Sequence, residues 1–246
     1  MNQKTDVWLK LSKKQVEDYH LKQFDKVYQS TIAFHMWLKS KEIIEKNDLI
    51  VDVGCGSGSN LIHLDDTFPD IECCGIDINE DLVSLGNTEM KKRNKSEIKI
   101  ICANFKTHSF KKKPKGILSY SFLSFLPSLD LGLEVMAAYS PDWIAATSLF
   151  YDGPLSCRTE VINHSETEDD HPTQCFYNTY SLEYTKKKFK DLGYNKFEFV
   201  PFDIDIDLLK PDDKRLGTYT ERLPSGRRLQ ISGPLLMNWH FILAKK

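Results

Sequence analysis

Apolar runs of strand length recur through the middle of the chain, and most of them are followed by a stretch whose apolar residues have helical spacing. Strands that alternate with helices are typical of a parallel sheet covered by helices on both faces. The pattern therefore predicts an α/β fold with a doubly wound, mostly parallel Rossmann-like sheet. The first five strands are expected at residues 49–53, 72–77, 98–102, 116–120 and 143–148.

The two ends of the chain have different patterns. Residues 11–46 contain no Gly or Pro and place apolar residues at helical spacing, which predicts a helical lead-in before the first strand. Beyond residue 180, the pattern predicts a helix that starts at Ser181 and stops at Gly193, followed by an extended run over 197–206. Residues 239–244 are expected to form the final strand.

We expect an N-terminal helical part and a larger second domain that contains an acceptor-side loop and a hairpin. The sequence predicts an N-terminal helical cap over residues 1–46 and a Rossmann-like domain over residues 47–246. A polar stretch over about 151–180 is expected to be a loop at the acceptor side. Pro224-Ser225-Gly226 between two extended stretches predicts a hairpin over about 216–232.

Composition narrows the class of partner. The chain has 33 basic and 35 acidic residues and a formal net charge of -2, without the basic excess that phosphate-directed nucleic-acid binding favours. The N-terminus lacks a signal-peptide core, and no apolar run approaches the roughly 20 residues of a membrane span. Six cysteines without CxxC spacing indicate small buried thiols in a reducing compartment. These features predict a soluble, cytoplasmic protein that contacts no membrane.

The first strand ends in the glycine-rich segment Gly54-Cys55-Gly56-Ser57-Gly58. Glycines allow a sharp turn and close approach of a ligand, and the helix that follows offers free N–H groups to an anion. A dinucleotide fingerprint would place glycine at position 59, where this chain has Ser59. Asp52 adds an acid that can meet a cationic amine. Amides for a carboxylate and an acid for an ammonium group fit the methionine part of S-adenosylmethionine.

The ends of the next strands supply the remaining contacts of such a ligand. Asp77 ends the second strand, where a carboxylate can accept both ribose hydroxyls. Asn104 and Phe105 follow the third strand and suit the edge and face of an adenine ring. Ser121 follows the fourth strand, close to where a methyl donor would lie.

With these motifs the chain resembles the class I S-adenosylmethionine-dependent methyltransferases over roughly residues 45–150. The resemblance implies a seven-stranded sheet with an antiparallel last strand, S-adenosyl-L-methionine as cofactor and S-adenosyl-L-homocysteine as product. One departure is Asn104, since an Asp is commoner there. The cofactor residues implied are Asp52, Gly54, Cys55, Gly56, Asp77, Ile78, Asn104, Phe105 and Ser121, with Tyr28 and Ser30 from the cap; the acceptor residues are Tyr19, Gln23, Tyr177 and Tyr180.

Candidate bases lie in the polar stretch over 151–180. His164 could accept a proton from a hydroxyl, because an ordinary histidine pKa near ~6.5 suits that role, and His171 is a second candidate. The alternative is that both are idle surface histidines. The other histidines lack metal-ligand spacing, and the Asp203 to Asp207 alternation lacks the Gly and Glu of a calcium loop, so no metal is predicted.

The sequence thus favours methyl transfer to a small-molecule acceptor, with a hydroxyl of a metabolite, sugar or sugar-nucleotide as our choice. Two alternatives stay open. One is an RNA methyltransferase that uses the basic runs at 91–93 and 111–113; the other is a non-catalytic protein that binds S-adenosylmethionine.

Overall fold

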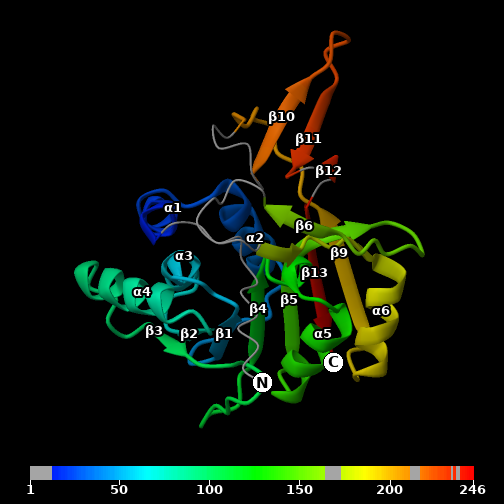
Figure 1. Ribbon diagram of the computed structural model, residues 1–246. Coiled ribbons are helices and arrows are strands. Elements are labelled where there is room, and N and C mark those ends of the chain that lie inside the picture. Colours follow the sequence, from blue (N-terminus) through cyan, green and yellow to red (C-terminus); the bar gives the residue numbers. More distant parts are fainter. Residues whose placement is uncertain (1–12, 164–172, 211–216, 234, 237–238) are drawn as a thin grey trace.

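The computed structural model describes residues 13–163, 173–210, 217–233, 235–236 and 239–246. Its central sheet runs in the order β3-β2-β1-β4-β5-β13-β9, with the short β8 paired to β5 beside this path (Figure 1). β13 is antiparallel to both of its neighbours, and the other strands of the path run parallel to one another. The predicted doubly wound α/β fold with an antiparallel last strand is confirmed. The strands are β1 (Leu49–Val53), β2 (Glu72–Asp77), β3 (Lys99–Cys102), β4 (Gly116–Tyr120), β5 (Trp143–Tyr151), β8 (Tyr180–Ser181), β9 (Lys196–Pro201) and β13 (Trp239–Lys245).

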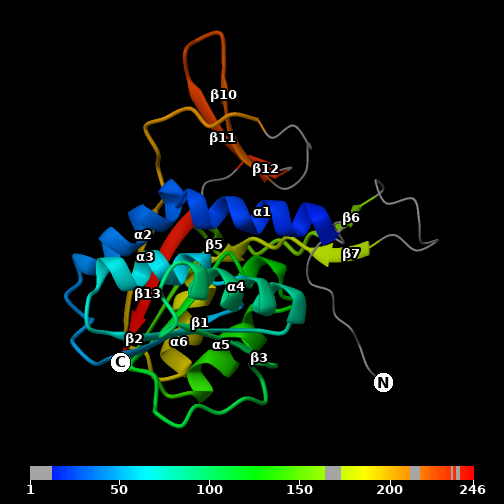
Figure 2. The ribbon, with the colours of Figure 1, turned by 90° about the vertical axis from the view of Figure 1, so that its left-hand side faces the viewer.

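Helices cover both faces of this sheet (Figure 2). Every residue of β1 is buried, because helices pack on either side of it, as is typical of central parallel strands. One core cluster joins the sheet to α5 and α6, and the other joins it to α1, α2, α3 and α4. None of the helices that the structure describes is long and apolar enough to cross a membrane. The helices are α1 (Lys13–Asp25), α2 (Gln29–Lys39), α3 (Ser59–Thr67), α4 (Glu80–Lys92), α5 (Leu129–Ala138) and α6 (Leu182–Asp191), with a 3-10 turn η1 at Leu123–Phe125.

Three expectations about local structure need correction. The helical lead-in is two helices, because the chain turns at residues 26–28 and α1 then packs on α3 and α4 while α2 packs on α3. The extended run after Gly193 ends at Pro201, one residue before the N–H of Phe202 donates to the carbonyl of Trp239 at the start of β13. Of the cysteines, Cys73 is buried as expected, but Cys102 and Cys157 are exposed.

Two antiparallel additions lie at the carboxyl end of the parallel strands. The first consists of β6 (Glu160–Asn163) and β7 (Thr173–Phe176), inside the stretch that the sequence analysis treats as a loop. The second consists of β10 (Thr218–Arg222), β11 (Arg228–Ser232) and β12 (Leu235–Leu236). It is inserted between the end of β9 and the start of β13, and it projects from the main sheet (Figure 1). We call it the projecting sheet.

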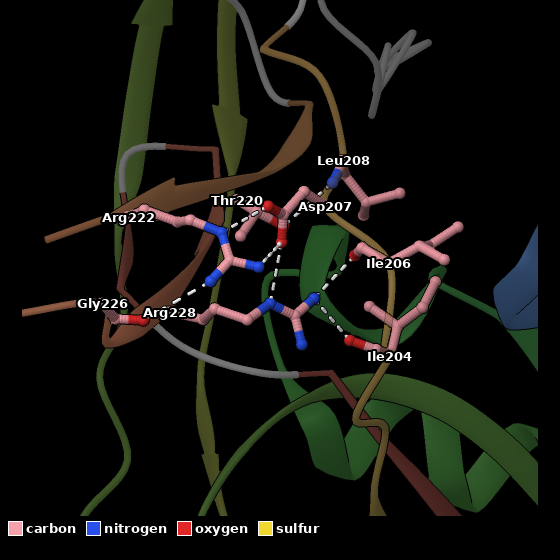
Figure 3. A network of polar contacts seen from close by, with 8 residues as sticks. All are labelled: Ile204, Ile206, Asp207, Leu208, Thr220, Arg222, Gly226 and Arg228. Carbon is pink, nitrogen blue, oxygen red and sulfur yellow. Dashed lines mark hydrogen bonds and ion pairs between the residues drawn. The ribbon is translucent and has the colours of Figure 1, made fainter.

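A polar network ties the projecting sheet to residues 203–208, which we call the strap (Figure 3). Asp207 accepts hydrogen bonds from Nε of Arg222 at 2.6 Å and from Nε of Arg228 at 2.8 Å. Arg228 also donates to the carbonyl oxygens of Ile204 and Ile206, each at 2.7 Å. The strap is therefore held along its length by two guanidinium groups that share one carboxylate.

Replacing Asp207 by Ala is expected to loosen the strap without unfolding the protein. Both arginines are partly exposed and return to solvent when the carboxylate is lost. The amides of Leu208 and Thr220, which bond across the strap and β10, should then exchange with deuterium several-fold faster. Amides of β1 serve as the internal reference. Unchanged exchange at Leu208 and Thr220 would show that Asp207 does not hold the strap.

Candidate cofactor site

The glycine-rich segment after β1 is a tight turn held by its own backbone. Gly54, Gly56 and Gly58 all have positive φ angles, of 73°, 57° and 73°, a region that favours glycine. The N–H groups of Gly54 and Cys55 donate to the carbonyl of Ile76. The N–H of Gly56 donates to Oδ2 of Asp77 at 2.8 Å, and the N–H of Gly58 donates to the carbonyl of Cys55.

This arrangement corrects one part of the sequence interpretation. Four amides of the turn are already used inside the protein, so they shape the turn and do not bind an anion. The donors left for an anion are the N–H groups of Ser59 and Asn60 at the start of α3, since the N–H of Leu61 donates to the carbonyl of Gly58. Gly54, Cys55 and Gly56 stay partly exposed at the surface of the turn. The turn is therefore a rigid, reachable platform in front of a helix N-terminus.

Asp52 is the most unusual residue of the site. Its side chain is fully buried on β1, and neither carboxylate oxygen has a hydrogen-bond partner among the residues that the structure describes. Burial, and to a smaller degree the charge of Asp77, raises the pKa of Asp52 well above its ordinary value. An unpartnered buried carboxylate is costly for a protein to keep. The Asp52 carboxylate fits a site that receives a cationic group, such as the ammonium group of S-adenosylmethionine.

Asp77 ends β2 beside the turn. Its Oδ1 accepts from the N–H of Asn79 at 2.9 Å while its Oδ2 holds Gly56. Burial raises the pKa of Asp77, and backbone hydrogen bonds from Asn79, Gly56 and Ile78 oppose that rise. The following Ile78 is 61% exposed, which is unusual for a large apolar side chain and suits one that covers a flat ligand.

The two residues after β3 take different positions. Asn104 is exposed, and its Oδ1 accepts from the N–H of Lys106 at 3.0 Å, so it shapes the local turn. Phe105 is half-buried, with its ring edge-on to Phe122 at 5.3 Å between centroids. Phe105 thus lies at the site, whereas the Asn104 oxygen already has a partner.

The end of β4 brings in Phe122, the aromatic residue that follows Ser121. Ser121 has a positive φ of 54°, a strained conformation for a residue with a side chain, and its N–H donates to Oγ1 of Thr147 at 2.9 Å. The turn places the ring of Phe122 beside Gly54. A Cβ added at Gly54 would lie 2.5 Å from that ring. Only its place next to Ser121 could have pointed to Phe122.

The N-terminal helices approach the turn from the other side. Gln23 accepts a hydrogen bond from the Ser59 hydroxyl at 3.0 Å, and Nδ1 of His20 lies 3.1 Å from the Ser57 hydroxyl. Burial lowers the pKa of His20 to about 4, so the imidazole is neutral at physiological pH. His20 was missed by the sequence analysis, because no motif marks it. The exposed Tyr19 lies on α1, the exposed Tyr28 directly precedes α2, and the half-buried Ser30 lies on α2.

Tyr177 and Tyr180 are the remaining predicted residues that the structure describes. Tyr177 is 1% exposed and Tyr180 is 6% exposed, and both belong to the core. The Tyr180 hydroxyl donates to the carbonyl of Leu123 at 2.9 Å. Both tyrosines therefore have packing roles here, and neither is assigned to the acceptor site. His164 and His171 lie outside the described residues.

Comparisons with known proteins agree with this geometry. Residues 50–138 match a family model described as a methyltransferase domain. No sequence among curated proteins matches the chain. The fold is similar to that of YcgJ from Bacillus subtilis, with a TM-score of 0.59 at 10% identity over 89% of this chain and 99% of that one.

Two further structures share the fold. One is the Synechocystis magnesium protoporphyrin IX methyltransferase with bound S-adenosylmethionine, with a TM-score of 0.56 at 13% identity over the whole of both chains. The other is the Burkholderia thailandensis 1,6-didemethyltoxoflavin-N1-methyltransferase, with a TM-score of 0.55 at 11% identity over 95% of this chain and 88% of that one. Residues 50–138, which include the glycine turn, thus match a methyltransferase domain, and the chain shares its fold with S-adenosylmethionine-dependent methyltransferases.

Proposed function

We propose that this enzyme transfers the methyl group of S-adenosylmethionine to a hydroxyl group of a small molecule. The observation that carries the cofactor site is the buried, unpartnered carboxylate of Asp52 beside the glycine turn. Asp52 would hold the amino group of the cofactor, Asp77 the ribose hydroxyls, and the first turn of α3 the carboxylate. Ile78 and Phe105 would cover the adenine ring.

The cofactor supplies a methyl group that is already activated as a sulfonium. The task of the chain is therefore to hold donor and acceptor in line and to exclude water. Such positioning can contribute ~7–11 kcal/mol of barrier lowering. The rigid turn and the strained Ser121 fix the position of Phe122, which packs at the floor of the site beside Gly54.

Two observations support a small acceptor. Two of the structural neighbours are named for small-molecule substrates, a magnesium porphyrin and a toxoflavin precursor. In addition, most basic side chains of the two runs are already paired. Lys92 and Arg93 pair with Glu89 and Asp25, Lys112 pairs with Glu72, and Lys113 pairs with Asp142. This pairing reduces the charge that could attract RNA phosphates.

Calorimetry and turnover together test the proposal. Titration with S-adenosylhomocysteine should show saturable binding at one site. Turnover with labelled S-adenosylmethionine and a panel of hydroxy, amino and carboxyl metabolites should then favour hydroxyl acceptors. Salt-sensitive binding and methylation of tRNA with no small acceptor turned over would refute the small-molecule choice. Binding of S-adenosylhomocysteine with no turnover of either class would favour a non-catalytic role.

A further inference from the structure

His20 of α1 lies directly over the glycine turn. A Cβ added at Gly56 would lie 3.2 Å from Cε1 of the imidazole, which is closer than most Cβ contacts in proteins. Nδ1 of His20 and the hydroxyl of Ser57 share a hydrogen bond of 3.1 Å, which fixes the ring in this position. The imidazole therefore leaves no room for a ligand atom on this side of Gly56.

The position that His20 fills lies on the path of the cofactor in the proposed function. Asp77 would hold the ribose hydroxyls, and the N–H groups at the start of α3 would hold the carboxylate. Gly56 lies between these two places, since its N–H donates to Oδ2 of Asp77 and α3 begins at Ser59, three residues later. A ligand that spans them passes over Gly56, where a glycine allows close approach. The imidazole and the cofactor would thus compete for one space.

Neighbouring groups of the site are also closed to solvent. The carboxylate of Asp52 is fully buried, and the side chains of Ser57 and Ser59 are buried as well. Gln23 of α1 adds a second polar contact over the turn, because it accepts a hydrogen bond from the Ser59 hydroxyl at 3.0 Å. A ligand group that must reach Asp52 therefore requires a covering element to move.

Of the two N-terminal helices, α1 is held less firmly than α2. Both helices pack on α3 (Figure 2). α2 places Phe34 and Leu38 in the core without any exposed surface. Among residues 18–25 of α1, whose side chains the structure describes, Phe24 is the only buried apolar side chain. A segment with few buried apolar contacts opens at a low cost in free energy, and the turn at residues 26–28 lets α1 lift while α2 stays in place.

We propose that His20 is a plug, carried by α1, that closes the cofactor site, and that α1 lifts to withdraw it when the cofactor binds. The proposal rests on the proposed function in that it concerns the same cofactor site. Opening has a cost, because the hydrogen bonds of His20 and Gln23 to the turn are lost, so the apparent affinity is the intrinsic affinity reduced by the fraction of open protein. The gain on the other side is at Asp52, whose carboxylate acquires the ammonium group of the cofactor as a partner.

Histidine side-chain NMR of the full-length protein reports directly on the plug. Burial lowers the pKa of His20 to about 4, so in the free protein its ring should not titrate between about pH 5.5 and 8. With saturating S-adenosylhomocysteine the ring should move into water and titrate with a midpoint near the ordinary value of ~6.5. The spectrum of His20→Gln assigns the signal. A ring that still does not titrate when the ligand is bound would show that His20 is a fixed wall of the site and would refute the plug.

Calorimetry on variants tests the competition through the sign of the affinity change. His20→Ala removes both the ring and the hydrogen bond to Ser57, so it should bind S-adenosylhomocysteine about 5-fold more tightly than the wild type. If the ring instead contacted the ligand as a wall, its removal would weaken binding. Lys22→Ala, at an exposed position of α1, is the matched control and should bind like the wild type.

The outcomes separate the plug from the proposed function. Equal or weaker binding by His20→Ala, with normal binding by the wild type, would refute the plug and leave the cofactor site in place. Failure of the wild type to bind S-adenosylhomocysteine would instead refute the proposed function. Thermal melts establish that both variants are folded, and if His20→Ala does not fold, the NMR titration of the wild type decides alone.

Discussion

Asp52→Asn is expected to weaken S-adenosylhomocysteine binding by about 100-fold, or ~2.7 kcal/mol, while raising the melting temperature of the free protein. The carboxylate is fully buried and has no hydrogen-bond partner in the described part of the chain. Asn keeps the shape but cannot offer the charge that a buried ammonium group requires, which explains the loss of affinity. The same change removes a costly buried acid, worth ~2 kcal/mol, and should raise the melting temperature by about 4–8 °C.

The raised pKa of Asp52 determines the direction in which stability and ligand affinity change with pH. The pKa of Asp52 in the folded protein lies well above its ordinary value of 3.8, so the folded state binds that proton more tightly than the unfolded chain does. The resulting stabilisation is complete below the ordinary value and is lost as the pH rises through the folded-state pKa. The melting-temperature advantage of Asp52→Asn should therefore grow with pH. Ligand affinity of the wild type should rise over the same range, because the ammonium needs the ionised acid.

Isothermal titration from about pH 5.5 to 8 and thermal melts over the same range measure both effects. Asp191→Asn is the matched control, since Asp191 is exposed at the end of α6 and forms an ion pair with the exposed Lys187. It should leave both quantities nearly unchanged. Equal affinity and an equal pH profile in wild type and Asp52→Asn would place the amino group of the cofactor elsewhere.

The sheet could be predicted from the sequence because its signals are local. A strand such as Leu49–Val53 is buried on both faces, so it appears as an unbroken apolar run. The break between α1 and α2 could not be predicted in this way. No Gly or Pro marks residues 26–28, and the chain turns there because the two helices pack on different partners.

The candidate site also contains residues that local sequence signals place and residues that only tertiary packing places. Asp52, Gly54 and Asp77 are fixed by their place at strand ends, which the sequence reports directly. Phe122 and His20 reach the turn by tertiary packing, and no spacing rule connects either of them to Gly54 or Gly56. Tyr177 and Tyr180 show the reverse error. They sit in a polar stretch that suggests exposure, yet η1 packs against that segment and buries them.

At Gly86, helix propensity alone predicts the wrong direction for the stability change on substitution by Ala. It lies inside α4, where replacing Gly by Ala normally stabilises a helix by ~1 kcal/mol. In this structure an added Cβ would lie 2.1 Å from the carbonyl oxygen of Ser57, in the glycine turn, and 2.4 Å from the side chain of Ile100. A backbone oxygen of a hydrogen-bonded turn cannot move aside as a flexible side chain can. We therefore expect Gly86→Ala to push α4 away from the turn.

The expected result is a loss of both stability and cofactor affinity. Overpacking of this kind costs ~1–3 kcal/mol, which outweighs the helix propensity gained and should lower the melting temperature by several degrees. Binding of S-adenosylhomocysteine should weaken by about 10-fold or more, because the displaced segment contains Ser57 and adjoins the residues that would hold the ligand.

Ser84→Ala, two residues away on the exposed side of α4, is the matched control. It gains the same kind of helix propensity without a contact to the turn, so its melting temperature should rise slightly and its ligand affinity should not change. Gly86→Ala that melted higher than the wild type and bound S-adenosylhomocysteine normally would mean that α4 can slide without disturbing the turn. The turn would then owe its shape to β1, β2 and Asp77 alone. If affinity falls in Gly86→Ala but not in Ser84→Ala, the close contact between helix and turn is part of what makes the cofactor site.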